Sequence, residues 1–358
     1  MAFIAQNIVD HQLKELTHAL THVNKVDLEA FVQPASIDIP IGNKAYLVEN
    51  GFLPFAEKIQ TIMDQEGFII EEYDLTKKTR LIKNKTYLIP ILDVTLPKHV
   101  SAVFSPKSSI GRIDLMVRTI VDQFGYYDEM PAGSSGSVWL EVTPLSFDVE
   151  ITAKTPLNQV RFFDQEKEST INVQPQELIV NNTHDPLSNL FFAPNKYSLS
   201  LATQGDTIIG YQARQTARAI DMSQRDLDIH HFFEPVFAND DGSVMLRKDV
   251  FYIFATREFL RIPASYSVEM DASNTKIGEL RAHYAGFFDP GFGAQTGAQG
   301  VLEIRTSEDK LIRHGQQICT ISIHENTSTP KLLYGQRENN YQGQTGPRLA
   351  KYFKKQQS

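Results

Sequence analysis

A short stretch in the first half of the chain combines cations and hydroxyls in a pattern suited to chemistry. In FSPKSSIGRIDL, residues 104–115, strand-like residues are followed by Lys107, Ser108, Ser109 and Arg112. Small hydroxyls beside two cations, with a glycine that lets the backbone come close, indicate an anion-binding turn. The pattern alone leaves three interpretations open: a phosphate site, a catalytic site or a polar turn between two strands.

Two glutamates occur at corresponding places in similar strand-like segments, Glu141 in SVWLEV and Glu303 in GVLEIR. A carboxylate held rigidly on a strand can take a proton from water, and partial burial would raise its pKa and its basicity. Asp289 lies in DPGFG, which by itself is an ordinary turn pattern. Taken singly, each glutamate is most often an outward-facing strand residue, so these candidates gain weight only together.

Several familiar catalytic and nucleotide-binding patterns are missing from the sequence. It has no GxxxxGK[ST] loop, no GxGxxG after a strand and no GxSxG elbow. The single cysteine, Cys319, cannot supply the P-C-x-x-C of the zinc deaminases. His230, His231 and Glu234 in DIHHFFEP are expected to form a solvated turn, because adjacent strand side chains point apart. The sequence therefore predicts chemistry by carboxylates, hydroxyls and guanidinium groups, without zinc.

Strands must position these residues. From about Ile37 the chain alternates short β-branched and aromatic runs, such as KAYLV, TYLIPIL, SAVFS, SVWLEV and FDVEI, with turn-forming residues. That texture predicts a mainly β sandwich or barrel. Before it, Ile8, Leu13, Leu16 and Leu20 recur near helical spacing and predict an N-terminal helix.

The chain also resembles itself. LIKNKTYLIPILDVTLPKHVSAVFS, from Leu81, is similar to MLRKDVFYIFATREFLRIPASYSVEM, from Met245. Equivalent positions are roughly 160 to 166 residues apart, which indicates a tandem duplication. We therefore expect a first barrel with the helical segment over residues 1–160, a connector over 161–195 and a second barrel with a C-terminal tail over 196–358.

The overall composition restricts the class of protein. The 358 residues are 41% hydrophobic and 22% charged, as in ordinary globular proteins. The net charge of −8 disfavours non-specific nucleic-acid binding, so a phosphate-bearing ligand needs a local cationic cluster. The sequence shows no long apolar run and no signal-peptide pattern, and its lone cysteine fits a reducing compartment. We expect a cytoplasmic protein without membrane or nucleic-acid partners.

Several motifs resemble, in order, the dCTP deaminase branch of the dUTPase-like superfamily. They are QPASIDIPIG, PKSSIGRIDLMV, AGFFDPGFG, GVLEI and the tail YGQRENNYQGQTG, and they are shared between the two halves. The chain is thus similar to the double-length bacterial form of that enzyme. The resemblance implies a tandem pair of distorted, jelly-roll-like β-barrels, with nucleotide sites between the barrels of a homo-oligomer.

The resemblance also implies a reaction, the hydrolysis of dCTP to dUTP and ammonia, which supplies dUMP for thymidylate synthesis. It implies that water attacks C4 with a glutamate as general base, that Mg²⁺ is carried by the substrate triphosphate, and that dTTP can act as a regulator. Three alternatives stay open. These are a dUTP pyrophosphatase, a bifunctional enzyme that performs both steps, and a nucleotide-binding regulator without catalysis.

Matching positions carry the family's roles onto this chain. The resemblance assigns catalytic roles to Ser108, Arg112, Glu141 and Glu303. It assigns substrate contacts to Lys107, Ser109, Ala285, Phe288, Asp289, Val301, Tyr334 and Gln344. Lys107 stands where the family usually has an arginine, so it supplies a point charge without the bidentate fork. Asn340 stands where the tail usually has a lysine, and Asp128 is a weaker counterpart of Asp289.

The motifs of the two halves are complementary. The second-half counterpart of KSSIGR is DASNTK, residues 271–276, which lacks the serine pair and the arginine. The first half has YYDEMPAGSSG in place of the DPGF loop. We therefore predict one type of site per chain, at a junction where the first half supplies Ser108 and Arg112 and the second supplies the Asp289 loop. Which of the two glutamates acts as the base stays open.

Overall fold

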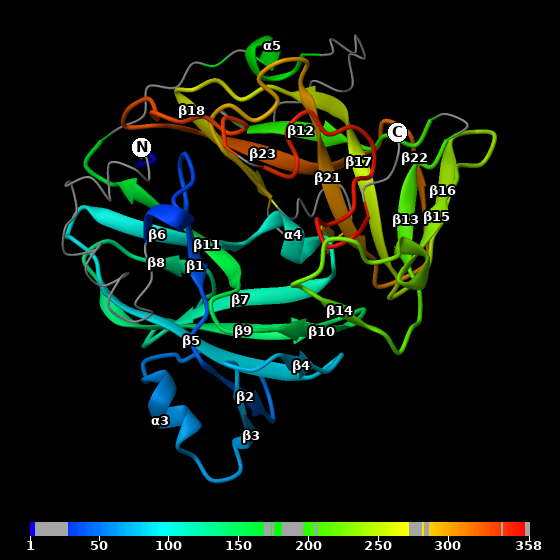
Figure 1. The fold of residues 1–358 in the computed structure, drawn as a ribbon. Coiled ribbons are helices and arrows are strands. Elements are labelled where there is room, and N and C mark those ends of the chain that lie inside the picture. The colour runs from blue at the N-terminus through cyan, green and yellow to red at the C-terminus, as the bar shows by residue number, and fades with distance from the viewer. Residues whose placement is uncertain are drawn as a thin grey trace.

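The structure, a computed structural model, describes residues 1–3, 28–167, 173, 175–180, 196–204, 207–271, 281–282, 286–337 and 339–354. The helix expected around Ile8 to Leu20 lies outside these ranges. Figure 1 shows that the described chain is built mainly from β-strands, which confirms the expected fold class. None of the helices in the described ranges has the length and apolarity needed to span a bilayer.

The first half contains two main antiparallel sheets. The larger has the strand order β3 (Ile69–Asp74), β2 (Lys44–Val48), β5 (Thr86–Thr95), β9 (Ser135–Pro144), β7 (Leu115–Val121). The second has the order β1 (Ile37–Pro40), β11 (Pro156–Asp164), β6 (Val100–Pro106), β8 (Glu129–Met130). Their sequences are rich in β-branched and aromatic residues, and in β6 and β7 buried positions alternate with partly exposed ones, as in a sheet with one face in the core.

The second half repeats this arrangement strand for strand. Its larger sheet has the order β15 (Phe233–Val236), β13 (Gly210–Ala213), β17 (Phe251–Leu260), β21 (Ala298–Arg305), β19 (Arg281–Ala282). The other has the order β12 (Lys196–Ser200), β23 (Gln317–Glu325), β18 (Tyr266–Asp271), β20 (Phe287–Phe288). A smaller pair joins β16 (Ser243–Leu246) to β22 (Lys310–Arg313), as β4 (Thr79–Leu81) joins β10 (Asp148–Ile151) in the first half. Equal strand order in both halves is the arrangement expected of a tandem duplication.

Short helical segments complete the described chain. They are η2 (Leu28–Phe31), α3 (Ile59–Met63), α4 (Ser108–Gly111), α5 (Pro175–Leu178) and η3 (Ile229–His231). The last strand of the first half, β11, continues to Asp164 because it pairs with β6 as far as Val100. The expected boundary at residue 160 therefore falls inside this strand.

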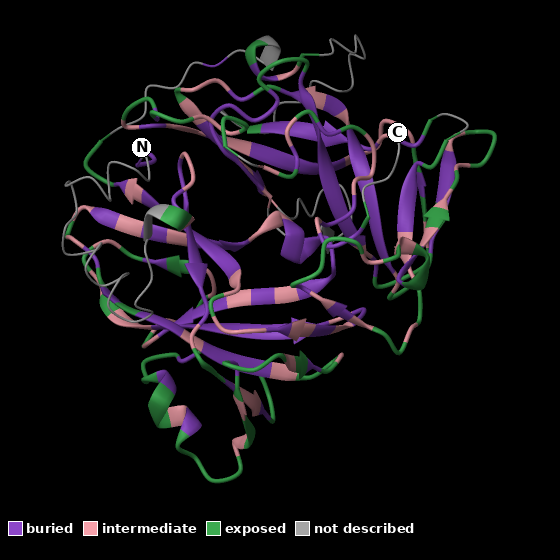
Figure 2. Cartoon of the chain, in the orientation of Figure 1, coloured by how far each residue is buried: buried purple, intermediate pink, exposed green. Residues whose placement is uncertain are grey.

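The two halves share a buried junction. The core of the first half continues into Phe233, Phe251 and Val301 of the second, and the tail returns to it with Tyr352 and Phe353. A second-half strand, β14 (Ala219–Asp221), pairs in parallel with β10. Figure 2 shows buried segments of both halves facing one another around α4. Removal of this apolar surface from water holds the halves together and fixes the surroundings of α4.

Candidate active site

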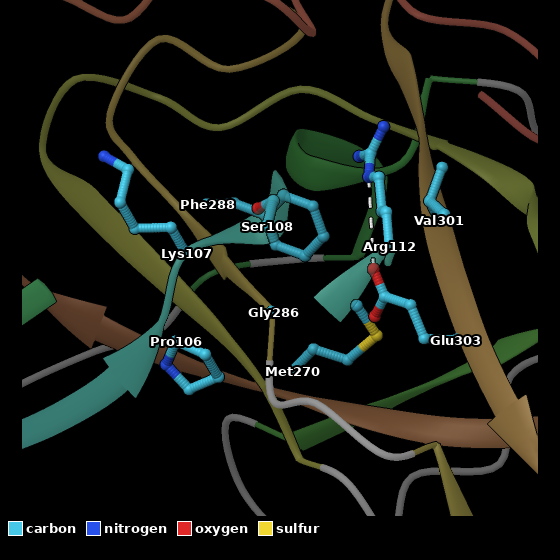
Figure 3. Close-up of a pocket in the computed structure, with 9 residues that line it drawn as sticks. All are labelled: Pro106, Lys107, Ser108, Arg112, Met270, Gly286, Phe288, Val301 and Glu303. Atoms are coloured by element: carbon cyan, nitrogen blue, oxygen red, sulfur yellow. Dashed lines mark ion pairs between the residues drawn. The ribbon is translucent and has the colours of Figure 1, made fainter. Parts of the chain in front are cut away.

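A small pocket lies at this junction and takes side chains from both halves. The first half lines it with Pro106, Lys107, Ser108 and Arg112, and the second with Met270, Gly286, Phe288, Val301 and Glu303. The first group comes from the end of β6 and from α4, and the second from the end of β18, from β20 and from β21 (Figure 3). The pocket thus brings together Ser108 and Arg112 with Glu303, residues that are far apart in the sequence.

Glu303 is the buried carboxyl of this pocket. It sits within β21, opposite Ile253 of β17, and is only 5% exposed. Burial raises its pKa to about 8, because a charged carboxylate is poorly solvated there, while the nearby Arg112 guanidinium opposes the shift. Arg112 Nε lies 3.9 Å from Glu303 Oε1, the contact drawn as a dashed line in Figure 3. A carboxyl of this kind can hold a proton near neutral pH and release it.

Arg112 is held in place by the C-terminal tail. Its Nη1 donates hydrogen bonds to Gln344 Oε1 at 3.1 Å and to the carbonyl of Arg348 at 3.0 Å. Its guanidinium also lies over the ring of Tyr341, 3.8 Å from the ring centroid. The tail therefore fixes the orientation of the cation that faces Glu303.

The two serines of α4 have different surroundings. Ser109 is buried, and its Oγ lies 2.6 Å from the hydroxyl of Tyr341. Ser108 is half-buried and lines the pocket. The Ser108 hydroxyl is therefore open to a ligand in the pocket, whereas the Ser109 hydroxyl is already hydrogen-bonded to the Tyr341 hydroxyl.

Lys107 is not a free cation in this structure. Its ammonium donates to Asp38 Oδ2, and Asp38 lies in β1 and is buried. Asp289, also buried, accepts a hydrogen bond of 2.9 Å from the backbone N–H of Ala35. Burial raises the pKa of Asp289 to about 7, and the charge of Asp38 adds to this shift. Asp38, which the sequence analysis did not single out, thus pairs with Lys107 and also acts on the charge of Asp289.

Of the remaining expected substrate contacts, Phe288 and Val301 line the pocket. Gln344 is buried and links Arg112 to the carbonyl of Gln299, to which its Nε2 donates at 2.7 Å. Phe288 and Tyr334 both contact the ring of Phe292. Val301 lines the pocket on β21, two residues before Glu303. The expected contact Ala285 lies outside the described residues.

Glu141, the counterpart of Glu303, lies elsewhere. It accepts hydrogen bonds from the Phe52 N–H at 3.1 Å and from the Tyr127 hydroxyl at 3.2 Å. A Cβ atom on Gly51 would lie only 2.5 Å from Glu141 Oε2, so this loop closes directly over the carboxyl. The weaker candidate Asp128 forms an ion pair with Arg118. Glu141 is therefore covered by side chains and a loop of its own half and does not line the junction pocket.

A further cation near the site was missed by the sequence analysis. Lys351 is half-buried in the tail, and its backbone N–H donates to the Tyr341 hydroxyl at 3.3 Å. Burial lowers the pKa of its ammonium to about 8, with Lys107 and Arg225 adding to the shift and Asp38 opposing it. Its nearest charges thus include two other cations. The only signal in the sequence was that Lys351 follows closely after the Gln-Gly-rich stretch YGQRENNYQGQTG of the tail.

The described residues do not form a metal site of their own. They contain no group of three or more His, Cys, Asp and Glu side chains that could hold an ion. Glu234 instead pairs with Arg214 and accepts a hydrogen bond from Gln212, and His230 and His231 belong to the exposed η3.

Fold and pocket together define a duplicated β protein with a carboxyl, a guanidinium and a serine collected at the junction of its halves. Models of the 2'-deoxycytidine 5'-triphosphate deaminase (DCD) match it in tandem, the N-terminal domain over residues 6–166 and the C-terminal domain over residues 166–353. The chain therefore belongs to the dCTP deaminase family.

A solved structure and two curated proteins are similar to the chain. The crystal structure of 2'-deoxycytidine 5'-triphosphate deaminase from Agrobacterium tumefaciens matches with a TM-score of 0.80 and 29% identity, over 91% of this chain and 98% of that one. A "dCTP deaminase, dUMP-forming" from Methanosphaera stadtmanae is 26% identical over 132 residues, which are 35% of this chain but 64% of that protein. A second protein of that name, from Nanoarchaeum equitans, is 26% identical over 174 residues, or 43% and 82%. The match to the first of these curated proteins thus spans less than two thirds of its length.

Proposed function

We propose that the chain hydrolyses the 4-amino group of dCTP and releases dUTP and ammonia, with Glu303 as the general base. The observation that supports this most is the shared pocket, in which Glu303 from one half faces Arg112 and Ser108 from the other. Membership of the dCTP deaminase family supports the substrate.

The proposed reaction forms a C4–O bond and breaks the C4–N bond of cytosine. Glu303 takes a proton from the attacking water and passes it to the ring nitrogen, and the second proton of that water, from the new C4 hydroxyl, goes to the departing amine, which leaves as ammonia. Its raised pKa suits both steps, because the carboxyl binds a proton near neutral pH and gives it up again. Ser108 and Arg112 orient the water, and the tail contacts to Arg112 keep that orientation fixed.

Positive charge for the triphosphate would come from Lys107 and Lys351. Lys107 can reach a phosphate only by sharing or leaving Asp38, whereas no carboxylate of the described chain lies within ion-pair distance of Lys351. Ser109 would add a hydroxyl on the same side, since Tyr341 joins it to the Lys351 backbone. Mg²⁺, if it takes part, would be carried by the phosphate oxygens of the substrate. Binding of dTTP, a homo-oligomer and a cytoplasmic location also stay predictions.

A second candidate is a bifunctional enzyme that continues to dUMP and pyrophosphate. The printed name of the two curated relatives, "dCTP deaminase, dUMP-forming", favours it. One assay separates the candidates: the purified chain is given dCTP or dUTP with Mg²⁺, and ammonia and pyrophosphate are both measured. Ammonia alone supports the deaminase, both products support the bifunctional enzyme, and neither product overturns both proposals.

A further inference from the structure

A second contact across the junction lies directly beside the pocket. Arg305 follows Glu303 by two residues on β21, and Asp114 follows Arg112 by two residues after α4. Arg305 Nη2 donates to Asp114 Oδ2 and, at 3.1 Å, to Ser146 Oγ. Ser146 Oγ in turn donates to Asp114 Oδ2 at 2.6 Å. Three side chains from two halves thus contact one another, and Arg305 Nη1 also donates to the carbonyl of Asp249 in its own half.

The strand geometry connects this network to Glu303. Side chains two residues apart on a strand lie on the same face, so Arg305 and Glu303 leave β21 on one side. The intervening Ile304 belongs to the core of the second half. A shift of Arg305 relative to Asp114 would therefore move Glu303 relative to Arg112.

Asp114 is held in an unusual conformation. It is fully buried and its φ of 55° lies in the left-handed region, which few residues other than glycine adopt. Aspartate tolerates this region better than most residues, but glycine would do so without strain. The aspartate side chain is what the Arg305 contact requires, which gives this strained position a reason.

We propose that Asp114 and Arg305, completed by Ser146, form a clamp across the two halves that sets the separation of Arg112 and Glu303. This rests on the proposed function of that pair. Asp114 and Arg305 are positioning residues, because their contacts reach the catalytic pair only through the turn and the strand that carry it.

The clamp also acts on the charge of the site. The charged groups that act on the pKa of Glu303 are Arg112, which lowers it, and Asp114, which raises it, while the charge of Glu303 raises the pKa of the buried Cys319 thiol of β23. Replacement of Asp114 by asparagine removes the negative charge that opposes ionisation of Glu303. The acid limb of the pH–rate profile should then move to lower pH, an effect that a purely structural contact would not produce.

The test compares D114N, R305Q and the double variant with the parent chain in dCTP deamination. We expect each single variant to lower kcat by roughly tenfold, as for misplaced catalytic groups, with less change in KM. The fold-loss of kcat in the double variant should be much smaller than the product of the two single fold-losses. K78Q is the matched control, because it removes the exposed ion pair between Lys78 and Asp221, which also joins the halves. It should leave kcat unchanged.

Two further measurements separate the possible failures. Thermal unfolding monitors whether D114N and R305Q stay folded at the assay temperature, so that loss of folded enzyme is not read as loss of kcat. The carboxyl-carbon resonance of Glu303, assigned by its absence in E303Q, titrates without any turnover. If the parent chain releases no ammonia but D114N shifts this titration, the proposed function is overturned and the clamp is supported. Unchanged kcat and an unchanged titration in folded D114N overturn the clamp.

Discussion

Arg112 Nε and Glu303 Oε1 lie 3.9 Å apart, close enough to attract but without a hydrogen bond. Another nitrogen of the same guanidinium, Nη1, donates to both Gln344 and the carbonyl of Arg348 in the tail. Because the tail holds Arg112 in this way, Glu303 is only partly neutralised, and burial still raises its pKa. The distance therefore leaves Glu303 both restrained and basic, as a proton acceptor for water must be.

The two glutamates should respond differently to the same substitution. E303Q removes the proposed base and should lower kcat by about 10²–10⁴-fold while dCTP still binds. E141Q should keep kcat near the parent value, because Glu141 is closed in by Phe52, Gly51 and Tyr127, outside the pocket. Steady-state deamination assays measure kcat, and titration calorimetry with dCTP measures binding. An active E303Q with an inactive E141Q would reverse the assignment.

The deamination rate should depend on pH through Glu303. A base must be ionised, and a carboxyl with a pKa of about 8 is only about one tenth ionised at pH 7. We expect kcat/KM to rise with pH and to reach half of its plateau near pH 8. A profile of kcat/KM from pH 5 to pH 9 measures this limb. A rate that is already flat above pH 6 would show that no carboxyl with a raised pKa controls the reaction.

Stability should change in the opposite sense to activity. The pKa of Glu303 is raised from 4.5 to about 8 on folding, so the stability that it contributes is full below pH 4.5 and declines up to pH 8. Glutamine does not titrate and avoids this loss, which at pH 7 is on the order of 3 kcal/mol. The Tm of E303Q should therefore exceed that of the parent at pH 7, with the difference disappearing near pH 4.5. Equal Tm values at both pH values would contradict a buried, proton-binding Glu303.

Much of the fold could be predicted from local patterns. The runs KAYLV, TYLIPIL and SAVFS form strands where their alternation and β-branched residues predict them. A junction at which Ser108 and Arg112 meet a segment of the second half also follows from comparing the two halves, whereas the choice between Glu141 and Glu303 does not. Those inferences need only the residue types within a segment and the order of segments.

The missed features depend on where distant segments meet. Asp38 contacts Lys107, and Tyr341 covers Arg112, only because β1 and the tail both return to α4. Closure of the loop at Gly51 over Glu141 likewise cannot be read from the similarity of SVWLEV and GVLEIR, since the strands are alike and their coverings differ. Such pairings arise from the packed chain rather than from any local pattern.

Lys351 offers a last test, which separates phosphate binding from chemistry. A charge-assisted contact to phosphate contributes about 1.5–3 kcal/mol, so K351M should raise KM for dCTP by roughly 10- to 100-fold with little change in kcat. Deoxycytidine, which lacks phosphate, should bind both proteins equally. K354M is the matched control, because Lys354 is an exposed lysine of the same tail. Since the pKa of Lys351 is about 8, the parent KM should also rise above pH 8 as the ammonium loses its proton. A KM that K351M leaves unchanged would remove Lys351 from the phosphate site and leave that role to Lys107.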